Sequence, residues 1–117
     1  MVAWIVSQTE SSEVDVLRNS YYKHCVIKSF RCQRTEALYN GRRVREFASF
    51  AAQAERRLEI LNAATTLQDL AGLPGNRLEA LKGDRKGQHS IRVNDQWRIC
   101  FVWTVGDADN VEIVDYH

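Results

Sequence analysis

The sequence contains few of the residues that mark several large classes of protein. Its 117 residues include one proline and six glycines, which excludes collagen-like and low-complexity chains. The three cysteines are an odd number without a C-x-x-C spacing, so we expect neither a disulfide framework nor a zinc ribbon, and we predict a cytoplasmic setting. The apolar run at residues 2–6 is too short for a signal-peptide core or a membrane span, so no membrane partner is expected.

Basic residues are missing from the last part of the chain, although the formal net charge is only +1. Residues 99–117 contain four acidic side chains and no Lys or Arg. Residues 26–98 contain 14 Lys and Arg against 8 Asp and Glu. A basic body of this kind suits an anionic partner such as RNA, and a solvated surface of uneven charge is the plainer interpretation.

The apolar pattern predicts an α+β domain in which an N-terminal short strand and helices pack on one face of a small antiparallel β-meander. The helical part should contain a short strand at residues 26–30, one or two helical turns at 35–39 and a longer helix at 46–64. The sequence Thr66-Leu67-Gln68-Asp69 resembles a capping box and predicts a further short helix. The strands are predicted at residues 89–93, 97–105 and 110–117.

An apolar stripe with a period of two fixes how the first two of these strands should pair. The stripe consists of Trp97, Ile99, Phe101, Trp103 and Val105. A three-residue loop at 94–96 places Arg92 opposite Arg98, on the face away from the stripe. Two like charges that face each other destabilise a sheet, so this pair indicates that an anion binds between them.

A four-residue loop before the last strand extends the same argument. Arg98 then pairs with His117 and Cys100 with Asp115, so one open face collects Arg92, Arg98, Asp115 and His117. Such a set fits cleavage of an RNA backbone without a metal or another cofactor, because arginines hold phosphate and a histidine transfers a proton. A surface salt-bridge network around Asp115 is the alternative.

Several stretches of the sequence resemble the HigB-type toxins of bacterial type II toxin–antitoxin systems, which belong to the RelE/ParE superfamily. The main stretch runs from residue 76 to residue 101, and the closing V-E-I-V-D-Y-H matches the terminal D-Y-H of that family. The likeness reaches back to the I-K-S-F at residues 27–30, and it implies a RelE/ParE-like toxin domain over residues 26–117. Residues 1–25 have no counterpart in the family pattern, so we interpret them as an N-terminal extension or a mis-annotated start.

The resemblance implies an enzyme, a ribosome-dependent mRNA endonuclease (mRNA interferase) that enters the decoding site and stops translation and growth. It also implies a HigA-type helix-turn-helix antitoxin, through which alone the pair would bind operator DNA. Two alternatives share the fold: a ParE-like gyrase inhibitor that cuts no RNA, and an inactive relative that only binds the antitoxin or RNA.

The resemblance and the basic loop together supply the candidate site residues. The catalytic candidates are Arg98, Asp115, Tyr116 and His117. The candidate RNA-binding residues are Lys82, Arg85, Lys86, His89 and Arg92. Where some relatives carry a histidine, three residues before Lys82, this chain has Glu79. The role of that histidine then passes to Glu79, to His89 or to no residue.

Overall fold

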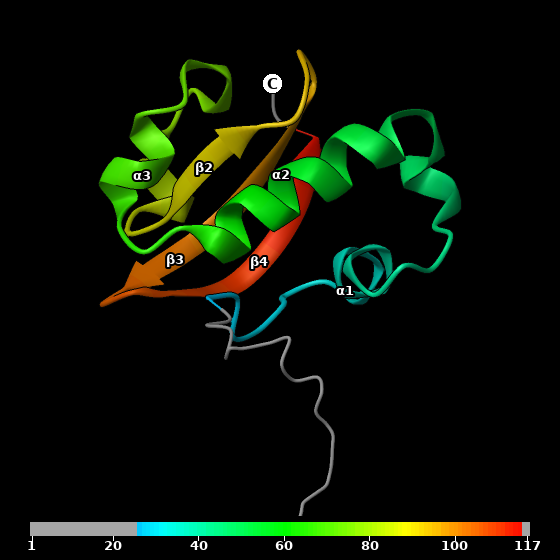
Figure 1. Ribbon diagram of the computed structural model, residues 1–117, viewed down its shortest axis with the longest axis horizontal. Helices are drawn as coiled ribbons and strands as arrows, with labels where there is room; N and C mark the ends of the chain where they lie inside the picture. The colour runs from blue at the N-terminus through cyan, green and yellow to red at the C-terminus, as the bar shows by residue number, and fades with distance from the viewer. Residues whose placement is uncertain (1–25, 116–117) are drawn as a thin grey trace, which may run out of the picture.

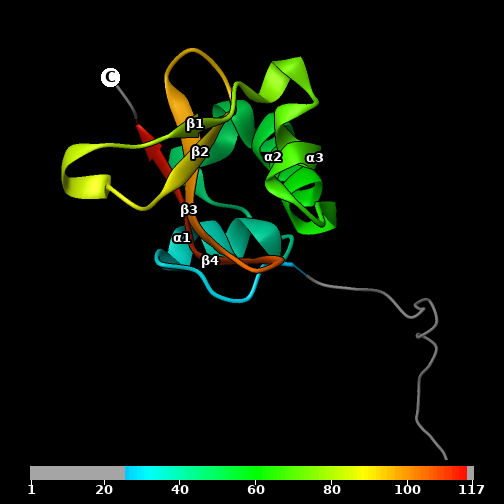
Figure 2. The ribbon, with the colours of Figure 1, turned by 90° about the vertical axis from the view of Figure 1, so that its left-hand side faces the viewer.

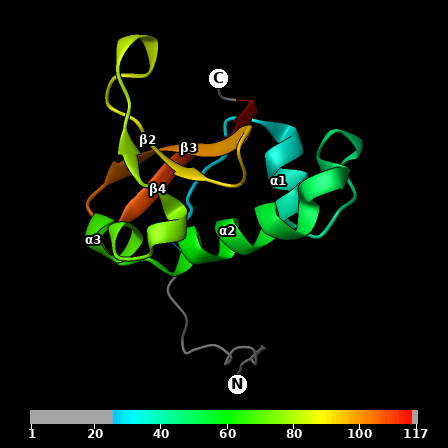
Figure 3. The ribbon, with the colours of Figure 1, turned by 90° about the horizontal axis from the view of Figure 1, so that it is seen from above.

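A computed structural model describes residues 26–115, so residues 1–25, Tyr116 and His117 lie outside the described part of the chain. The helical elements are α1 (Gln33–Tyr39), the 3-10 helix η1 (Arg45–Phe50), α2 (Ala51–Ala63), α3 (Leu67–Ala71) and η2 (Pro74–Asn76). The remaining elements are β1 (Glu79–Ala80), the 3-10 turn η3 (Gly83–Arg85), β2 (His89–Arg92), β3 (Trp97–Thr104) and β4 (Asp107–Asp115). The four strands form an antiparallel sheet in the order β1-β2-β3-β4, with α2 and α3 on one face (Figures 1 and 3). This arrangement confirms the predicted α+β meander.

The short strand predicted at residues 26–30 is extended backbone beside β4. Two isolated parallel bridges, one of them between Ile27 and Ala108, join this segment to β4. The side-chain oxygen of Asn62 in α2 accepts the N–H groups of Val26 (3.0 Å) and Ile27 (2.9 Å). The segment therefore links the last turn of α2 to the edge of the sheet.

The long helix predicted at residues 46–64 consists of two segments, η1 and α2, that meet at Phe50. The backbone of Phe50 (φ −133°, ψ 21°) departs from helical geometry, so the two segments are not one continuous α-helix. The apolar face predicted for this helix consists of seven residues at helical spacing: Phe47, Phe50, Ala51, Ala54, Leu58, Leu61 and Thr65. The face is confirmed, because five of these residues are buried and Ala51 is partly buried. The last predicted member, Thr65, is exposed, because α2 ends at Ala63 and the buried Ala64 takes its place.

The predicted capping box is present at the start of α3. The Thr66 hydroxyl accepts the N–H of Asp69 (3.2 Å), and the Asp69 carboxylate accepts the N–H of Thr66 (3.2 Å). The same carboxylate accepts the Thr65 hydroxyl (2.7 Å). The helices of the described region are short, with 13 residues in α2, and none of them is long and apolar enough to cross a membrane.

The register predicted for the first hairpin is confirmed. Ile91 pairs with Ile99, and Arg92 pairs with Arg98. The predicted stripe faces the helices, since Ile99 and Phe101 are fully buried and the ring of Trp97 stacks on the ring of Phe50 with centroids 4.9 Å apart. The fifth member of the stripe was predicted wrongly.

That member, Val105, is fully exposed because it lies in the turn between β3 and β4. Thr104 pairs with Asp107 across this two-residue turn, in which Gly106 adopts a φ of 80°. Glycine carries no Cβ, so this left-handed conformation costs it little. The predicted four-residue loop is therefore wrong.

The shorter turn and a bulge change the pairing of β4 by three residues. Arg98 lies opposite Val114 and Cys100 lies opposite Glu112, where the sequence predicted His117 and Asp115 as the partners. The pairing shifts between Cys100 and Val102, where Asn110 adopts a φ of 53°. Because side chains alternate along a strand, an odd shift moves each β4 residue to the opposite face.

Candidate functional site

The face of the sheet opposite the helices carries two rows of paired side chains. One row contains Glu79, Ser90, Cys100 and Glu112, and the next contains Arg92, Arg98 and Val114. We call this surface the open face. At its β2–β3 end lies a hollow of about 420 Å³. The hollow is lined by Arg77, Glu79, Arg92, Asn94, Asp95 and Arg98.

Arg98 is buried in this surface, with 8% of its area exposed. Its Nε donates to the Ser90 hydroxyl (2.7 Å), and its Nη2 donates to the carbonyl oxygens of Ser90 (3.3 Å) and Arg77. The sequence predicted an exposed arginine here. The structure instead buries the Arg98 guanidinium in the hollow, where its hydrogen bonds join β3 to β2 and to the end of η2.

Arg92 lies opposite Arg98, as predicted, but its charge is balanced within the protein. Its guanidinium donates to the carboxylate of Asp95, which follows in the same hairpin and is 99% exposed. The like-charge pair is therefore compatible with the sheet, since an acidic neighbour offsets the repulsion. The ion pair is exposed to water, and a phosphate can compete with Asp95 for Arg92.

The loop between β1 and β2 supplies the other predicted basic residues. It projects from the sheet on the side away from α2 and α3 (Figure 2). Lys82 and Lys86 are exposed, whereas Arg85 turns back and donates to Gln88 (3.1 Å) and Glu112 (3.4 Å). Two lysines of the loop thus face solvent while Arg85 ties the loop to β4.

His89 lies on the opposite face from Arg92 and Arg98. It pairs with Phe101, and the two rings stack with centroids 6.2 Å apart. Its Nδ1 is buried without a hydrogen-bond partner among the described residues. The structure therefore separates His89 from the hollow, because neighbouring residues of a strand point to opposite faces.

Asp115 does not join the arginines as predicted. It pairs with Trp97, on the face that the helices cover, and its carboxylate accepts the side-chain N–H of Gln96 (2.9 Å). The three-residue shift of β4 is the reason. The other two members of the predicted catalytic set, Tyr116 and His117, lie outside the described residues.

The structure brings Glu79 and Arg77 into the hollow, and the sequence argument did not place either one there. Glu79 belongs to β1, a strand that the apolar pattern did not predict, and its pairing with Ser90 puts it on the open face. A prediction that added one more strand beside the first hairpin would have placed Glu79 on this face. Arg77 follows η2 in a left-handed conformation, which no sequence pattern signalled.

Cysteine chemistry is unfavourable at this surface. Cys100 is fully buried, and this burial raises the pKa of its thiol, so the neutral and unreactive form dominates. Within residues 26–115, no cluster of three or more His, Cys, Asp or Glu side chains has the arrangement of a metal site. The open face is thus a surface of guanidinium, carboxylate and hydroxyl groups.

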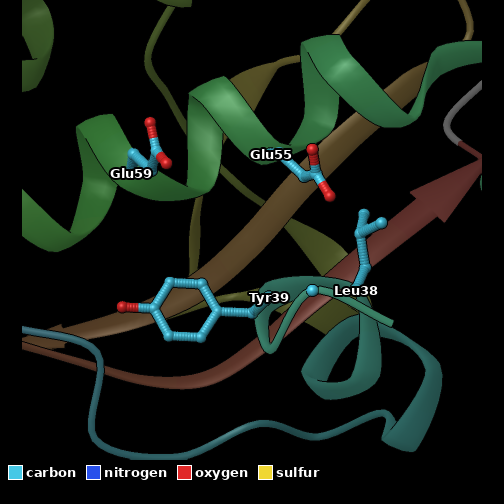
Figure 4. A pocket seen from close by; sticks show the side chains of 5 residues that line it. Leu38, Tyr39, Glu55 and Glu59 are labelled. Atoms are coloured by element: carbon cyan, nitrogen blue, oxygen red, sulfur yellow. The ribbon is translucent and has the colours of Figure 1, made fainter. Parts of the chain in front are cut away.

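A second hollow, of about 430 Å³, lies between α1 and α2. Figure 4 shows Glu55 and Glu59 of α2 on one side, with Leu38 and Tyr39 of α1 on the other. Its two carboxylates repel phosphate, so this groove has the wrong charge for an RNA backbone. The hollow on the open face is the candidate site for an anion.

The comparisons with known proteins agree with the fold. A family model described as the RelE-like toxin of type II toxin-antitoxin system HigB matches residues 28–117. A search of solved structures finds a chain of the YoeB-YefM complex from Staphylococcus aureus, with a TM-score of 0.50 and 16% identity. The match covers 81% of this chain and 99% of that chain, and it shows a RelE-like α+β fold.

Two curated relatives share a more similar sequence. Toxin HigB-1 of Vibrio cholerae serotype O1 is 54% identical over 55 residues, which is 47% of this chain and 58% of the relative. Endoribonuclease HigB of Proteus vulgaris is 41% identical over 61 residues, 52% of this chain and 65% of the relative. The matches span about three fifths of the length of these relatives. Because the family model matches most of the sequence, the chain belongs to the family of RelE-like HigB toxins of type II toxin–antitoxin systems.

Proposed function

We propose that this protein is the toxin of a type II toxin–antitoxin module and cleaves mRNA that is being translated on the ribosome. The observation that carries the proposal is the hollow on the open face, in which three guanidinium groups meet two carboxylates. One similar relative, from Proteus vulgaris, is named an endoribonuclease. A site with excess positive charge and a carboxylate base suits phosphodiester cleavage.

The proposed reaction is attack of a ribose 2′-hydroxyl on the adjacent phosphorus. The hydroxyl gives its proton to a base, the bond from phosphorus to the 5′-oxygen breaks, and an acid protonates the leaving oxygen. The products are a 2′,3′-cyclic phosphate and a 5′-hydroxyl end. Arg92 and Arg98 would stabilise the charge that builds on the phosphate oxygens. The reaction is a transesterification: the bond from the 2′-oxygen to phosphorus replaces the bond to the 5′-oxygen, two proton transfers accompany this exchange, and the proposal assigns no part to a metal ion.

Glu79 is the proposed base. Its carboxylate lines the hollow together with Arg92 and Arg98, whereas His89 lies on the other face of the sheet. Of the three options that the sequence left open, the geometry supports Glu79. On the acid side, the proposal keeps the sequence-derived residues Tyr116 and His117, with His117 as the proton donor. It leaves out Asp115, which lies on the other face of the sheet.

Contacts outside the hollow would hold the message and the ribosome. Lys82 and Lys86 are exposed on the projecting loop and form no ion pair within residues 26–115, so both can contact a phosphate backbone directly. We propose that the loop contacts RNA through these two lysines. Arg85, held by Glu112, would fix the direction of the loop.

The proposal includes a protein partner. A HigA-type antitoxin with a helix-turn-helix domain would neutralise the toxin in the cytoplasm and would carry the pair to operator DNA. Family membership supports an antitoxin partner. The type of antitoxin and the ribosome as the site of action rest on the family resemblance.

Induced expression of the full chain, with mapping of the 5′ ends of cellular mRNA, tests this function. We expect growth arrest together with new 5′-hydroxyl ends inside translated reading frames. Arrest without new ends would contradict cleavage and would favour a gyrase inhibitor of the same fold. Normal growth and intact mRNA, with the protein present in soluble form, would indicate an inactive relative.

A further inference from the structure

We propose that Arg77 binds the scissile phosphate in the hollow, and that Arg98 positions it by holding its backbone. The inference rests on the proposed RNA cleavage and assigns a role to a residue outside the catalytic and RNA-binding sets derived from the sequence. Arg77 lines the hollow together with Arg92 and Arg98. Its backbone, its anchoring and its charge each support the assignment.

The backbone of Arg77 is in an unfavourable conformation. Its φ of 43° and ψ of 56° are left-handed, a region that side chains with a Cβ rarely occupy. Asn110 is the other described residue besides glycine with a positive φ, and it lies at the bulge of β4. A glycine would fit position 77 without strain, so the arginine side chain must offset its conformational cost in some other way.

The chain around Arg77 is fixed from both sides. Asn76 is fully buried, its side-chain N–H donates to the carbonyl of Leu70 (3.0 Å), and its side-chain oxygen accepts from Arg57 (2.6 Å). On the other side, Nη2 of Arg98 donates to the carbonyl of Arg77. The position of the Arg77 Cα is thereby set before any ligand arrives, which lowers the entropic cost of binding.

Of the three arginine side chains that line the hollow, Arg77 is the most accessible to a ligand. Arg92 is paired with Asp95, and Arg98 is buried on Ser90 and on the backbone of Arg77. Arg77 is exposed and forms no ion pair within residues 26–115. A planar guanidinium can hold two phosphate oxygens at once, so Arg77 is suited to meet the phosphate first.

The test compares Arg77→Gly with Arg56→Ala in the full chain. Both variants remove one positive charge, and Arg56 lies exposed on α2, in the layer that covers the other face of the sheet. The measurements are the thermal midpoint, the affinity for single-stranded RNA at several salt concentrations, and the rate of mRNA cleavage in a translating extract.

Arg77→Gly should keep or raise the thermal midpoint, because glycine relieves the left-handed backbone. Its RNA affinity should fall about 10-fold, and its salt dependence should lose about 0.7 of a unit in slope, the value for one phosphate contact with a single strand. Cleavage should fall at least as much as binding. Arg56→Ala should match the wild type in all three measurements.

Arg77→Asn is the second variant, since asparagine tolerates left-handed backbone and carries no charge. It should bind RNA as weakly as Arg77→Gly. If both variants bind and cleave RNA as Arg56→Ala does, the role of Arg77 is wrong while the proposed function stands. If the wild-type protein neither binds nor cleaves RNA, the proposed function and this inference both fail.

Discussion

At the scale of single residues, Arg98 lies in a different environment from the one that the sequence indicated. The sequence placed it on an open face, and the structure buries its guanidinium among hydrogen-bond acceptors. The Arg98 guanidinium is only 8% exposed, and its N–H groups donate to the Ser90 hydroxyl and to the carbonyl of Arg77. The same bonds link β3 to β2 and to the end of η2. Arg98 therefore contributes to the stability of the site as well as to its charge.

Arg98→Ala should lower both stability and activity. Removal of the guanidinium leaves the Ser90 hydroxyl and the Arg77 carbonyl without this partner, at a cost of about 1–3 kcal/mol in the free energy of unfolding. The cleavage rate should fall about 10²–10³-fold, as on loss of one donor to a charged transition state. Chemical denaturation and a cleavage assay measure the two effects. Full cleavage activity in the variant would contradict the role of Arg98.

Trp97→Ala should act on stability alone. The indole stacks on Phe50 and meets Phe47 edge-on, with ring centroids 5.8 Å apart, so it joins β3 to η1. We expect a loss of about 3 kcal/mol in the free energy of unfolding, at the lower end for a large aromatic residue because Trp97 is only partly buried. Urea denaturation measures this loss, and an unchanged midpoint would show that the ring does not stabilise the core.

At the scale of elements, short-range signals determine where α3 begins. The Thr65 hydroxyl, and then the backbone N–H groups of Thr65 and Thr66, donate to the Asp69 carboxylate, and these hydrogen bonds lower the pKa of Asp69. A lowered pKa in the folded state means that the carboxylate stabilises the fold above its unfolded pKa. This contribution is lost as the pH falls through the folded pKa.

Asp69→Ala therefore gives a pH-dependent prediction. At pH 7 the variant should unfold at a lower urea concentration than the wild type, because the backbone N–H of the N-cap residue Thr66 loses the Asp69 carboxylate as its acceptor. The difference should shrink as the pH falls below the usual range of an aspartate, where the wild-type carboxyl is protonated as well. Urea midpoints measured from pH 7 to pH 2.5 test the sign. A difference that stays constant with pH would assign the effect to packing.

At the scale of the whole molecule, the helices pack on one face of the sheet and the candidate chemistry lies on the opposite, open face. The helices cover one face of the sheet (Figures 1 and 2), and helices and strands both contribute side chains to the core between them. The open face and the loop carry Arg77, Arg92, Arg98 and the two exposed lysines. The acidic residues near the end of the sequence do not form a separate patch. Glu112 holds Arg85, and Asp109 accepts from Ser29 and Thr104.

His117→Ala tests how the toxin acts in the cell. If His117 donates the proton to the leaving oxygen, the full-length variant should stay folded and should lose both growth arrest and new mRNA ends. The measurement is induced expression of both proteins side by side, with circular dichroism of the purified variant as the control for folding. Growth arrest that persists in the variant would favour a toxin that does not cut RNA.

The sequence by itself determined the α+β class, the start of α3 and the pairing of the first hairpin. Each depends on local or alternating patterns: the Thr66–Asp69 capping box, the stripe from Trp97 to Trp103, and the turn at residues 94–96. These signals act over a few residues, so the sequence is sufficient to predict them. The shared face of Arg92 and Arg98 was predicted as well, and both residues line the hollow.

Only the tertiary structure decided which residues complete that face. The turn at Gly106 and the bulge at Asn110 shift β4 by three residues, and the bulge lies where residues 26–30 pair with β4 from a distant part of the chain. That shift separates Asp115 from the arginines, whereas the pairing of β1 and the left-handed Arg77 bring new side chains to the hollow. Long-range packing selects among several locally acceptable turns and registers, so a local pattern cannot predict the result.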